Sequence, residues 1–253
     1  VGMGLLALMG AGIDPSQIYM VSIMPCTAKK HEKERPEFAT DGNPNVDSVI
    51  TTQELGRMIE EAGIQFPALS PESFDLPFGF KTGGGVIFGN SGGVSEAVLR
   101  YASEKLTDQK LDNVVFDQVR GEEFYRVTTV TVGDIELKLA VVSGLSNAKK
   151  LAEKVKAGQA DVDLIEVMAC PGGCVGGAGQ PIGFDPQTLK KRTKGIYDTD
   201  KTMQLHKPQE NPYVQEAYEQ CLGEIGGEKA HKLLHTHYQN RKRIGDTGIS
   251  LVN

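Results

Sequence analysis

The chain has 253 residues, enough for one large domain or two small ones with a substantial core. Hydrophobic residues make up 39% and charged residues 24% of the sequence, and no run of 18 apolar residues occurs, so a membrane span is excluded. The net charge of −6 argues against a nucleic-acid-binding protein, and four cysteines are too few for a disulfide scaffold of this length.

The first predicted elements are a helix, a buried strand and a second helix. Residues 1–12 have the spacing of an amphipathic helix without an initiator methionine or an export signal, so we expect a piece of a longer chain. Residues 17–24 are apolar at nearly every position, which predicts a strand buried on both faces of a parallel sheet. After a polar loop over residues 27–45, the capping box at residues 51–54 predicts a helix that ends at Gly63.

The middle of the chain combines glycine-rich loops with strands. Residues 65–79 lack periodicity and are predicted to form an ordered loop. Residues 81–93 are predicted to form a short strand between two glycine clusters, and a helix is expected over residues 94–106. Three further strands are predicted over residues 113–119, 126–132 and 135–142.

One more helix and one more strand complete this pattern. Ser146 is expected to cap a helix that ends at Gly158, and residues 162–168 form another apolar run typical of a buried strand. Strands and helices that alternate at this spacing predict an α/β fold, with a largely parallel sheet flanked by helices.

The composition becomes polar and basic near residue 187. Asn211 and Pro212 form a favourable N-cap and first-turn pair for one helix, and a second helix is expected over residues 228–235. We therefore divide the chain into an α/β part, residues 1–186, and a C-terminal helical extension, residues 187–253.

Two cysteine-bearing loops follow predicted buried strands. Cys26 comes directly after residues 17–24, and Cys170 and Cys174 flank a Pro-Gly-Gly turn after residues 162–168. Because the carboxyl ends of parallel strands carry the ligand-binding loops of α/β sheets, we expect both loops to converge on one site. The glycines after Cys174 are expected to leave room for a bulky group.

These cysteines admit several interpretations. A nucleophilic or buried structural cysteine beside a glycine-rich turn would explain the second loop alone. A structural zinc site usually needs four nitrogen or sulfur ligands, whereas iron–sulfur clusters use cysteine thiolates at varied spacing.

Three other features of the sequence are assigned structural roles. Cys221 lies in the predicted C-terminal helix and is expected to be a small buried hydrophobe. His235 and His237 are two residues apart, so they would not face each other on a helix, and we expect structural or surface positions. The basic run 190–194 is expected to form a solvated loop, with docking of a redox partner as the alternative.

Two long motifs around the cysteines resemble signatures of the iron-only (FeFe) hydrogenases. Residues 24–32, MPCTAKKHE, resemble the second signature of this family, and residues 166–181, EVMACPGGCVGGAGQP, resemble the third. Residues 86–94 are similar to the family's glycine-rich loop, and residues 210–238 are similar to its small-subunit-like extension. The resemblance extends over almost the whole chain.

The resemblance implies that the chain forms one lobe of the hydrogenase catalytic domain, which contains the H-cluster. In this family the H-cluster is a 4Fe–4S cubane joined by a cysteine sulfur to a two-iron subcluster with CO, cyanide and dithiolate ligands. Cys26, Cys170 and Cys174 match three of the four cubane ligands, and Cys174 matches the bridging one. Lys29 matches a lysine that hydrogen-bonds a cyanide, since a buried anion needs a charged donor. Glu32 is expected either to hold Lys29 or to remain solvated. Three apolar residues match walls of the two-iron site, namely Met24, Phe88 and Met168.

The implied reaction in an intact parent protein is the reversible reduction of two protons by two electrons to dihydrogen. The sequence contains no Thr-Ser-Cys-Cys-Pro, the signature that carries the family's fourth cubane ligand and its proton-relay cysteine. The fragment alone is therefore expected to be inactive and to hold either no cofactor or adventitious zinc.

Two alternatives stay open. Ser95 and the Asn90-Ser91 pair replace residues that are commoner in the family, which motivates a hydrogen-sensing protein. A hydrogenase-like iron–sulfur assembly factor is the other alternative, and Lys29 within the complete MPCTAKK run weighs against it.

The resemblance also implies partners. These are the missing N-terminal lobe, maturation proteins, and an electron partner that is either ferredoxin or an NAD(P)H-linked flavin subunit. No nucleic-acid partner is expected, and the expected location is the cytoplasm.

Overall fold

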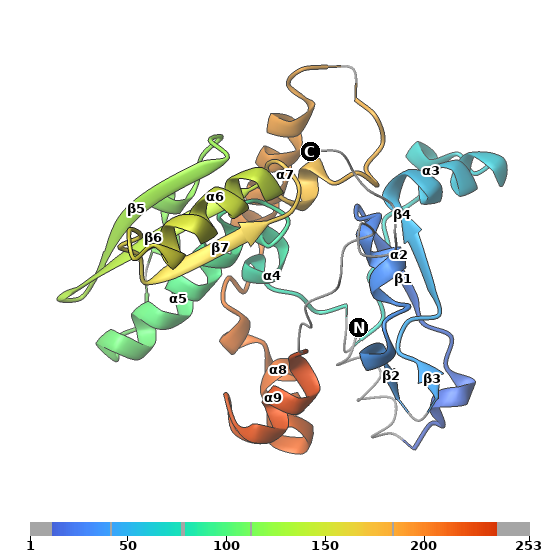
Figure 1. Ribbon diagram of the computed structural model, residues 1–253. Helices are drawn as coiled ribbons and strands as arrows, with labels where there is room; N and C mark the ends of the chain where they lie inside the picture. The colour runs from blue at the N-terminus through green and yellow to red at the C-terminus, as the bar shows by residue number, and fades with distance from the viewer. Residues whose placement is uncertain (1–11, 41, 77–78, 112, 184, 237–253) are drawn as a thin grey trace, which may run out of the picture.

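The computed structural model describes residues 12–236, except residues 41, 77, 78, 112 and 184, as an α/β structure with small sheets (Figure 1). The predicted α/β class is confirmed, whereas the helix expected over residues 1–12 lies almost wholly outside the described residues. Among the helices that the structure describes, none is both long and apolar enough to cross a bilayer.

The first sheet leads to Cys26. Strand β1 (Val21–Met24) follows a 3₁₀ turn, η1 (Pro15–Gln17), and pairs in parallel with β4 (Ser48–Thr51). The connection contains α2 (Ala28–Glu32), η2 (Pro36–Phe38), β2 (Ala39–Thr40) and β3 (Asn43–Pro44). Val21 and Ile23 are 42% and 52% exposed, so the expected burial of this strand on both faces is wrong for the described part of the chain.

Helix α3 (Thr52–Glu61) begins at the predicted capping box. The Glu54 N–H donates to Thr51 Oγ1 at 3.2 Å, and the Thr51 N–H donates to Glu54 Oε2 at 2.8 Å. Gly63 follows the helix with a left-handed φ of 69°, a conformation that favours glycine. The predicted loop then contains one 3₁₀ turn, η3 (Phe66–Ala68), among its described residues.

The glycine-rich segment predicted to be a strand forms helix α4 (Gly83–Ile87) instead. Thr82 caps this helix, because its Oγ1 accepts the Gly85 N–H at 3.3 Å. A Cβ on Gly83 would lie 1.8 Å from Asp200 Oδ1, so glycine permits close contact with the C-terminal extension. These tertiary contacts outweigh the low helix propensity of glycine.

The largest sheet contains β5 (Tyr125–Val132), β6 (Ile135–Ser143) and β7 (Leu164–Met168). Strands β5 and β6 form an antiparallel hairpin, and β7 pairs in parallel with β6. The parallel strands of the protein thus belong to two separate sheets. The strand predicted over residues 113–119 is wrong, because this segment contains only a 3₁₀ turn, η4 (Asp117–Val119).

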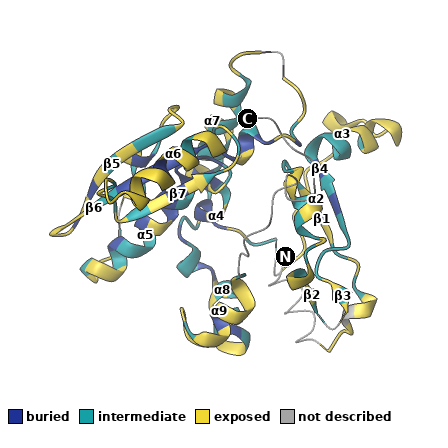
Figure 2. Cartoon of the chain, in the orientation of Figure 1, coloured by how far each residue is buried: buried dark blue, intermediate teal, exposed yellow. Residues whose placement is uncertain are grey.

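Helices cover both faces of this sheet. Helix α5 (Gly93–Thr107) packs on one face, and α6 (Leu145–Lys156) packs on the other (Figure 1). The core beneath α5 consists of Leu99, Val119, Val130, Val132, Leu139 and Val141. The core beneath α6 consists of Ala140, Val142 and Leu151. Dark blue segments in Figure 2 mark this buried region, whereas α9 is largely yellow and exposed.

The C-terminal extension is helical, as predicted. Its elements are α7 (Thr188–Thr202), η6 (Pro208–Glu210), α8 (Pro212–Ala217), the π-helical turn η7 (Tyr218–Leu222) and α9 (Glu228–Leu234). Asn211 caps α8, because its side chain accepts the Tyr213 N–H at 3.0 Å. The basic run 190–194 lies within α7, so its interpretation as a loop is wrong. The domain boundary at residues 186 and 187 stays a prediction.

The histidines of α9 lie at the end of the described chain. The ring of His235 contacts that of His231 with 4.6 Å between centroids, and His237 lies outside the described residues. Cys221 is partly buried in η7, which contacts α8 and α9.

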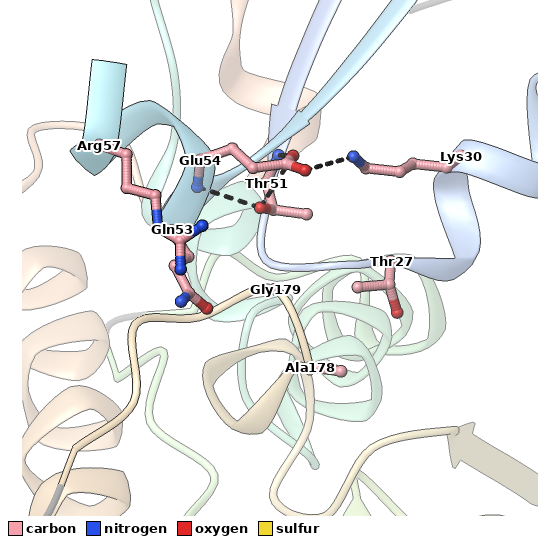
Figure 3. Close-up of a pocket in the computed structure, with 8 residues that line it drawn as sticks. All are labelled: Thr27, Lys30, Thr51, Gln53, Glu54, Arg57, Ala178 and Gly179. Atoms are coloured by element: carbon pink, nitrogen blue, oxygen red, sulfur yellow. Dashed lines mark hydrogen bonds and ion pairs between the residues drawn. The ribbon is translucent and has the colours of Figure 1, made fainter. Parts of the chain in front are cut away.

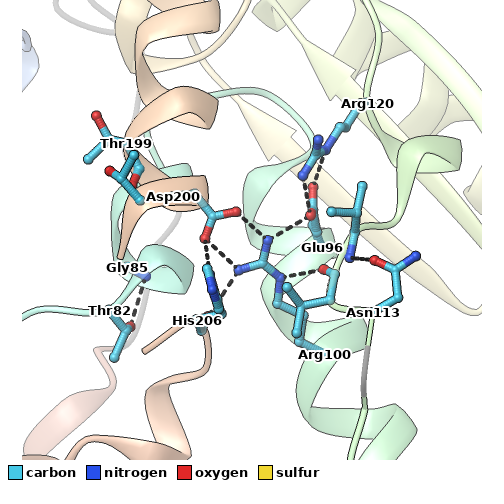
Figure 4. Close-up of polar contacts among 12 residues, drawn as sticks. Thr82, Gly85, Glu96, Arg100, Asn113, Arg120, Thr199, Asp200 and His206 are labelled. Carbon is cyan, nitrogen blue, oxygen red and sulfur yellow. Dashed lines mark hydrogen bonds and ion pairs between the residues drawn. The ribbon is translucent and has the colours of Figure 1, made fainter. Parts of the chain in front are cut away.

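A buried ion network joins α5 to this extension (Figure 4). The side chain of Arg100 is fully buried, and all five of its N–H groups have acceptors. Nε donates to Val114 O, Nη1 donates to Asp200 Oδ1 and His206 O, and Nη2 donates to Glu96 Oε1 and Asp200 Oδ2. These bonds are 2.7–3.0 Å long and connect three segments of the chain.

Glu104 connects α5 to the extension at the edge of this network. It accepts hydrogen bonds from Lys207 Nζ at 2.6 Å, from Gln209 Nε2 at 3.0 Å and from the Leu111 N–H at 3.0 Å. Burial by itself raises the pKa of Glu104, but these hydrogen bonds outweigh burial and lower the pKa from 4.5 to about 2.

The substitution Glu104→Gln is expected to destabilise the protein most at neutral pH. A carboxylate with a lowered native pKa contributes stability above pH 4.5, and this stability is lost as the pH falls from 4.5 towards 2. The difference in free energy of unfolding between wild type and variant should therefore shrink across this window, as measured by urea unfolding from pH 2 to pH 7. A difference that stays constant with pH would contradict the prediction.

Candidate functional site

The loops after β1 and β7 bring three cysteines into one region. Partial desolvation raises the pKa of the exposed Cys174 thiol, the nearby Cys26 and Cys170 raise it further, and the ammonium of Lys29 lowers it. Cys174 therefore lies within electrostatic range of all three residues. This arrangement matches the expected convergence of the two strand ends, and the role of the thiols as ligands stays a prediction.

Close backbone contacts hold the two loops together. The Gly179 N–H donates to Pro25 O at 3.2 Å, and the Gln53 N–H donates to Gly179 O at 2.9 Å. A Cβ on Gly177 would lie 2.0 Å from Pro25 O, and a Cβ on Gly179 would lie 2.8 Å from the Thr51 side chain. These glycines therefore make room for the chain's own backbone, which corrects the expectation that they leave space for a bulky group.

The second cysteine loop also contacts the glycine-rich segment before α5. The Val175 N–H donates to Gly89 O at 3.0 Å. Glu166, in β7, is buried and accepts the backbone N–H groups of Gly92 at 2.6 Å and Ser95 at 2.7 Å. Sequence reasoning missed Glu166, although a single carboxylate within an apolar strand was a usable signal of a buried hydrogen-bonding role.

The other residues assigned by resemblance lie around these loops. Lys29, in α2, donates to Glu32 Oε1 at 2.5 Å, so Glu32 holds Lys29 in this arrangement. This bond uses one of three ammonium hydrogens and leaves two for another acceptor. Met24 ends β1 and Met168 ends β7, which places both beside the cysteine loops. Phe88 follows α4 as its C-cap and is 44% exposed.

An open pocket of about 290 Å³ lies beside the junction of the two loops (Figure 3). Lys30 Nζ donates to Glu54 Oε1 at 2.5 Å in its wall. Hydrogen bonds from Lys30, followed by those from Thr51, lower the pKa of Glu54 to about 2. The described residues that line this pocket include none of the cysteines, so it is adjacent to the candidate ligands rather than formed by them.

The donor set fits part of an iron–sulfur cluster. Within the described residues, no group of three or more His, Cys, Asp or Glu side chains is close enough to hold a single metal ion. Each cysteine ligand of a 4Fe–4S cubane binds a different iron atom. Thiols that lie in one region but are too far apart to bind a single ion therefore suit a cubane. Three thiols with no oxygen ligand also form a soft donor set. They fit three corners of a 4Fe–4S cluster better than a single zinc ion.

Glycine at position 177 is expected to be essential for the loop junction. Gly177→Ala should lower the free energy of unfolding by about 1–3 kcal/mol, because the new Cβ overlaps Pro25 O. Gly195→Ala in α7 is the matched control, since that Cβ would meet no atom within 4 Å among the described residues outside its own stretch of helix, and it should stabilise the helix by up to about 1 kcal/mol. Urea unfolding of both variants tests this prediction, and effects of the same sign would contradict it.

Comparisons with known proteins match nearly the whole chain. The family described as iron only hydrogenase large subunit, C-terminal domain, matches residues 7–178, and the iron hydrogenase small subunit family matches residues 186–241. The NADP-reducing hydrogenase subunit HndD of Solidesulfovibrio fructosivorans is 48% identical over 92% of this chain and 40% of its own length. The cytosolic Fe-S cluster assembly factor narfl of Xenopus tropicalis is 34% identical over 94% of this chain and 51% of its own length.

A solved structure shares the fold. A variant of the FeFe-hydrogenase HydA1 from Chlamydomonas reinhardtii aligns with a TM-score of 0.76 and 39% sequence identity. The alignment covers 94% of this chain and 67% of that protein. This chain therefore spans about half or less of the two curated relatives and two thirds of the solved structure.

Proposed function

Because this chain belongs to the iron-only hydrogenase family, we propose that it forms the C-terminal part of a catalytic domain that interconverts protons and dihydrogen. The observation that carries this proposal is the meeting of Cys26, Cys170 and Cys174 beside Lys29. The chain spans 40% of the length of its NADP-reducing relative, so the activity belongs to a longer parent protein.

In this proposal Cys26, Cys170 and Cys174 would be ligands of a 4Fe–4S cluster, and Cys174 would be the one shared with the two-iron subcluster. Cys174 is exposed whereas Cys26 and Cys170 are partly buried, which suits a sulfur shared with a second metal unit. When bound, the cofactor supplies the redox chemistry that joins two protons and two electrons as dihydrogen.

The remaining residues shape the surroundings of the cofactor. Lys29, held by Glu32, would donate its other N–H groups to an anionic ligand of the two-iron unit. Met24 and Met168, at the ends of β1 and β7, and Phe88 would form apolar walls of the bound site. Apolar walls would strengthen the interaction between Lys29 and its anionic acceptor, because charges attract more strongly at low dielectric.

The parent's N-terminal lobe is the proposed partner of exposed apolar side chains on two strands, β1 and β7. Val21 and Ile23 of β1 are 42% and 52% exposed, and Ile165 and Val167 of β7 are 37% and 50% exposed. Large apolar side chains on a sheet are usually covered. The name of the NADP-reducing relative favours an NAD(P)H-linked flavin subunit over ferredoxin as electron partner. Maturation proteins would install the two-iron subcluster.

The isolated 253 residues are proposed to be inactive. The remaining cysteine, Cys221, lies in η7 against α8 and α9 rather than in either cysteine loop. The fourth thiolate and the proton-relay cysteine must therefore come from the parent protein.

Two observations favour other functions. Asn90 Oδ1, Ser91 Oγ and Ser95 Oγ are buried and have no hydrogen-bond partner among the described residues, so the segment that departs from the family pattern is chemically distinct, which favours a hydrogen sensor. The 34% identity to a cytosolic assembly factor favours a protein that holds the cubane alone.

Infrared spectroscopy of the parent protein, extended upstream to the missing cysteine signature and matured without oxygen, tests these proposals. CO and cyanide bands are expected, and hydrogen evolution from reduced viologen then separates an enzyme from a sensor. Cubane absorbance without these bands would overturn the hydrogenase proposal in favour of the assembly factor.

A further inference from the structure

We infer that Arg192 is a positioning residue that fastens the loop carrying Cys174 to helix α7. Its Nη2 donates to Pro181 O at 2.7 Å, and its Nη1 donates to Val175 O at 3.4 Å. These two carbonyls lie near opposite ends of the segment that follows Cys174, so one side chain ties both ends of the loop. The inference deepens the proposed role of Cys174 as a cluster ligand, and its functional meaning rests on that role.

One face of α7 contacts both the second cysteine loop and the glycine-rich segment before α5. A Cβ on Gly172 or Gly176 would lie 3.0 Å or 3.3 Å from the Leu189 side chain, so Leu189 packs directly against the cysteine loop. Asn90 Nδ2 donates to Thr193 O at 3.3 Å, which joins α7 to the glycine-rich segment before α5. The contacting positions recur at helical spacing and are Leu189, Arg192, Thr193 and Ile196.

Arg192 differs from the other basic residues of its run. The side chains of Lys190, Lys191 and Lys194 are 64%, 72% and 74% exposed, and they pair with surface carboxylates. Arg192 is partly buried and bonds backbone carbonyls instead. A planar guanidinium presents several donors in a fixed fork, whereas an ammonium is a compact point charge. Within the basic run, Arg192 therefore contacts the protein interior, whereas Lys190, Lys191 and Lys194 face solvent.

The two hydrogen bonds of Arg192 link the C-terminal extension to the loop that carries Cys174. The Val175 N–H donates to Gly89 O and the Val175 carbonyl accepts a hydrogen bond from Arg192, so both backbone polar groups of the residue that follows Cys174 are hydrogen-bonded. The position of the Cys174 sulfur then depends on the docking of α7 against the α/β part.

Hydrogen exchange of the full 253-residue chain tests the inference. Arg192→Ala is expected to speed exchange of the amides in residues 172–180 by about tenfold, because hydrogen bonds from a charged donor to that loop are lost. The β5–β6 hairpin should be unchanged and serves as the internal reference. Arg192→Lys, which can replace one bond, should give an intermediate rate, and Lys194→Ala should match wild type.

Iron retention provides the second readout. After anaerobic reconstitution of the parent protein, extended upstream to the missing cysteine signature, Arg192→Ala should lose iron to a competing chelator several times faster than wild type or Lys194→Ala. Faster exchange in both the loop and the hairpin, or in neither, would overturn the inference. A wild-type parent protein that takes up no iron would overturn the proposed function, while the exchange experiment on the 253-residue chain still decides the positioning role.

Discussion

Arg100→Leu is expected to lower the free energy of unfolding by about 3–5 kcal/mol, the usual cost of removing one partner from a buried ion pair. Desolvation works against the charged form of Arg100, but its bonds to Asp200 and Glu96 outweigh this effect and raise its pKa. In the variant, Glu96 keeps its bonds from Arg120, at 2.7 Å and 2.8 Å. Asp200, with a side chain only 3% exposed, would face just His206 among the described side chains.

Urea unfolding at neutral pH measures this effect. Lys149→Ala is the control, because Lys149 pairs with Glu153 at 3.9 Å on an exposed helix surface, and it should cost less than about 0.5 kcal/mol. Asp200→Asn in the Arg100→Leu background should recover part of the loss, since the unpaired buried charge is removed. Similar losses for Arg100→Leu and Lys149→Ala would show that the network does not hold the extension.

Cys174→Ser in the parent protein is expected to remove most of the iron bound after anaerobic reconstitution with iron and sulfide. Loss of residues that merely orient a metal ligand already lowers affinity about 10–100-fold, and loss of the ligand itself should exceed that. Of this chain's cysteines in the two loops, only Cys26 and Cys170 would remain, so the cubane would lack one of its four cysteine thiolates. The iron content per chain and the visible absorbance measure the loss.

Cys221→Ser is the matched control, because it makes the same chemical change in η7, outside the two cysteine loops. This variant should retain the iron content of wild type. Equal loss from both variants would contradict the assignment of Cys174, and retention by both would show that iron binds elsewhere.

Local signals in the sequence predicted several elements correctly. The reciprocal hydrogen bonds between Thr51 and Glu54 and the side-chain cap from Asn211 involve residues three or fewer apart. Such contacts need no distant partner, so the pattern alone specifies them. The two cysteine loops were also placed correctly at strand ends, because their positions follow from strand length and direction.

Features that depend on distant contacts were mispredicted or missed. The sequence of α4 has poor helix propensity, and its conformation depends on packing against residues after α7. The basic run 190–194 looked like a loop by composition, yet its inward residue Arg192 bonds Pro181 O and Val175 O. Glu166 required knowledge that β7 lies beside the start of α5. No local pattern encodes these neighbours.

The contact between Pro25 and Gly179 has a consequence for the biogenesis of the protein. It closes a loop of about 150 residues, a long-range contact of the kind that forms late in folding. During synthesis, Cys26 leaves the ribosome well before Cys170, Cys174 and helix α7. The three thiols can come together only after Cys174 has left the ribosome, so a cluster that needs all three thiolates would be inserted after most of the chain has been made.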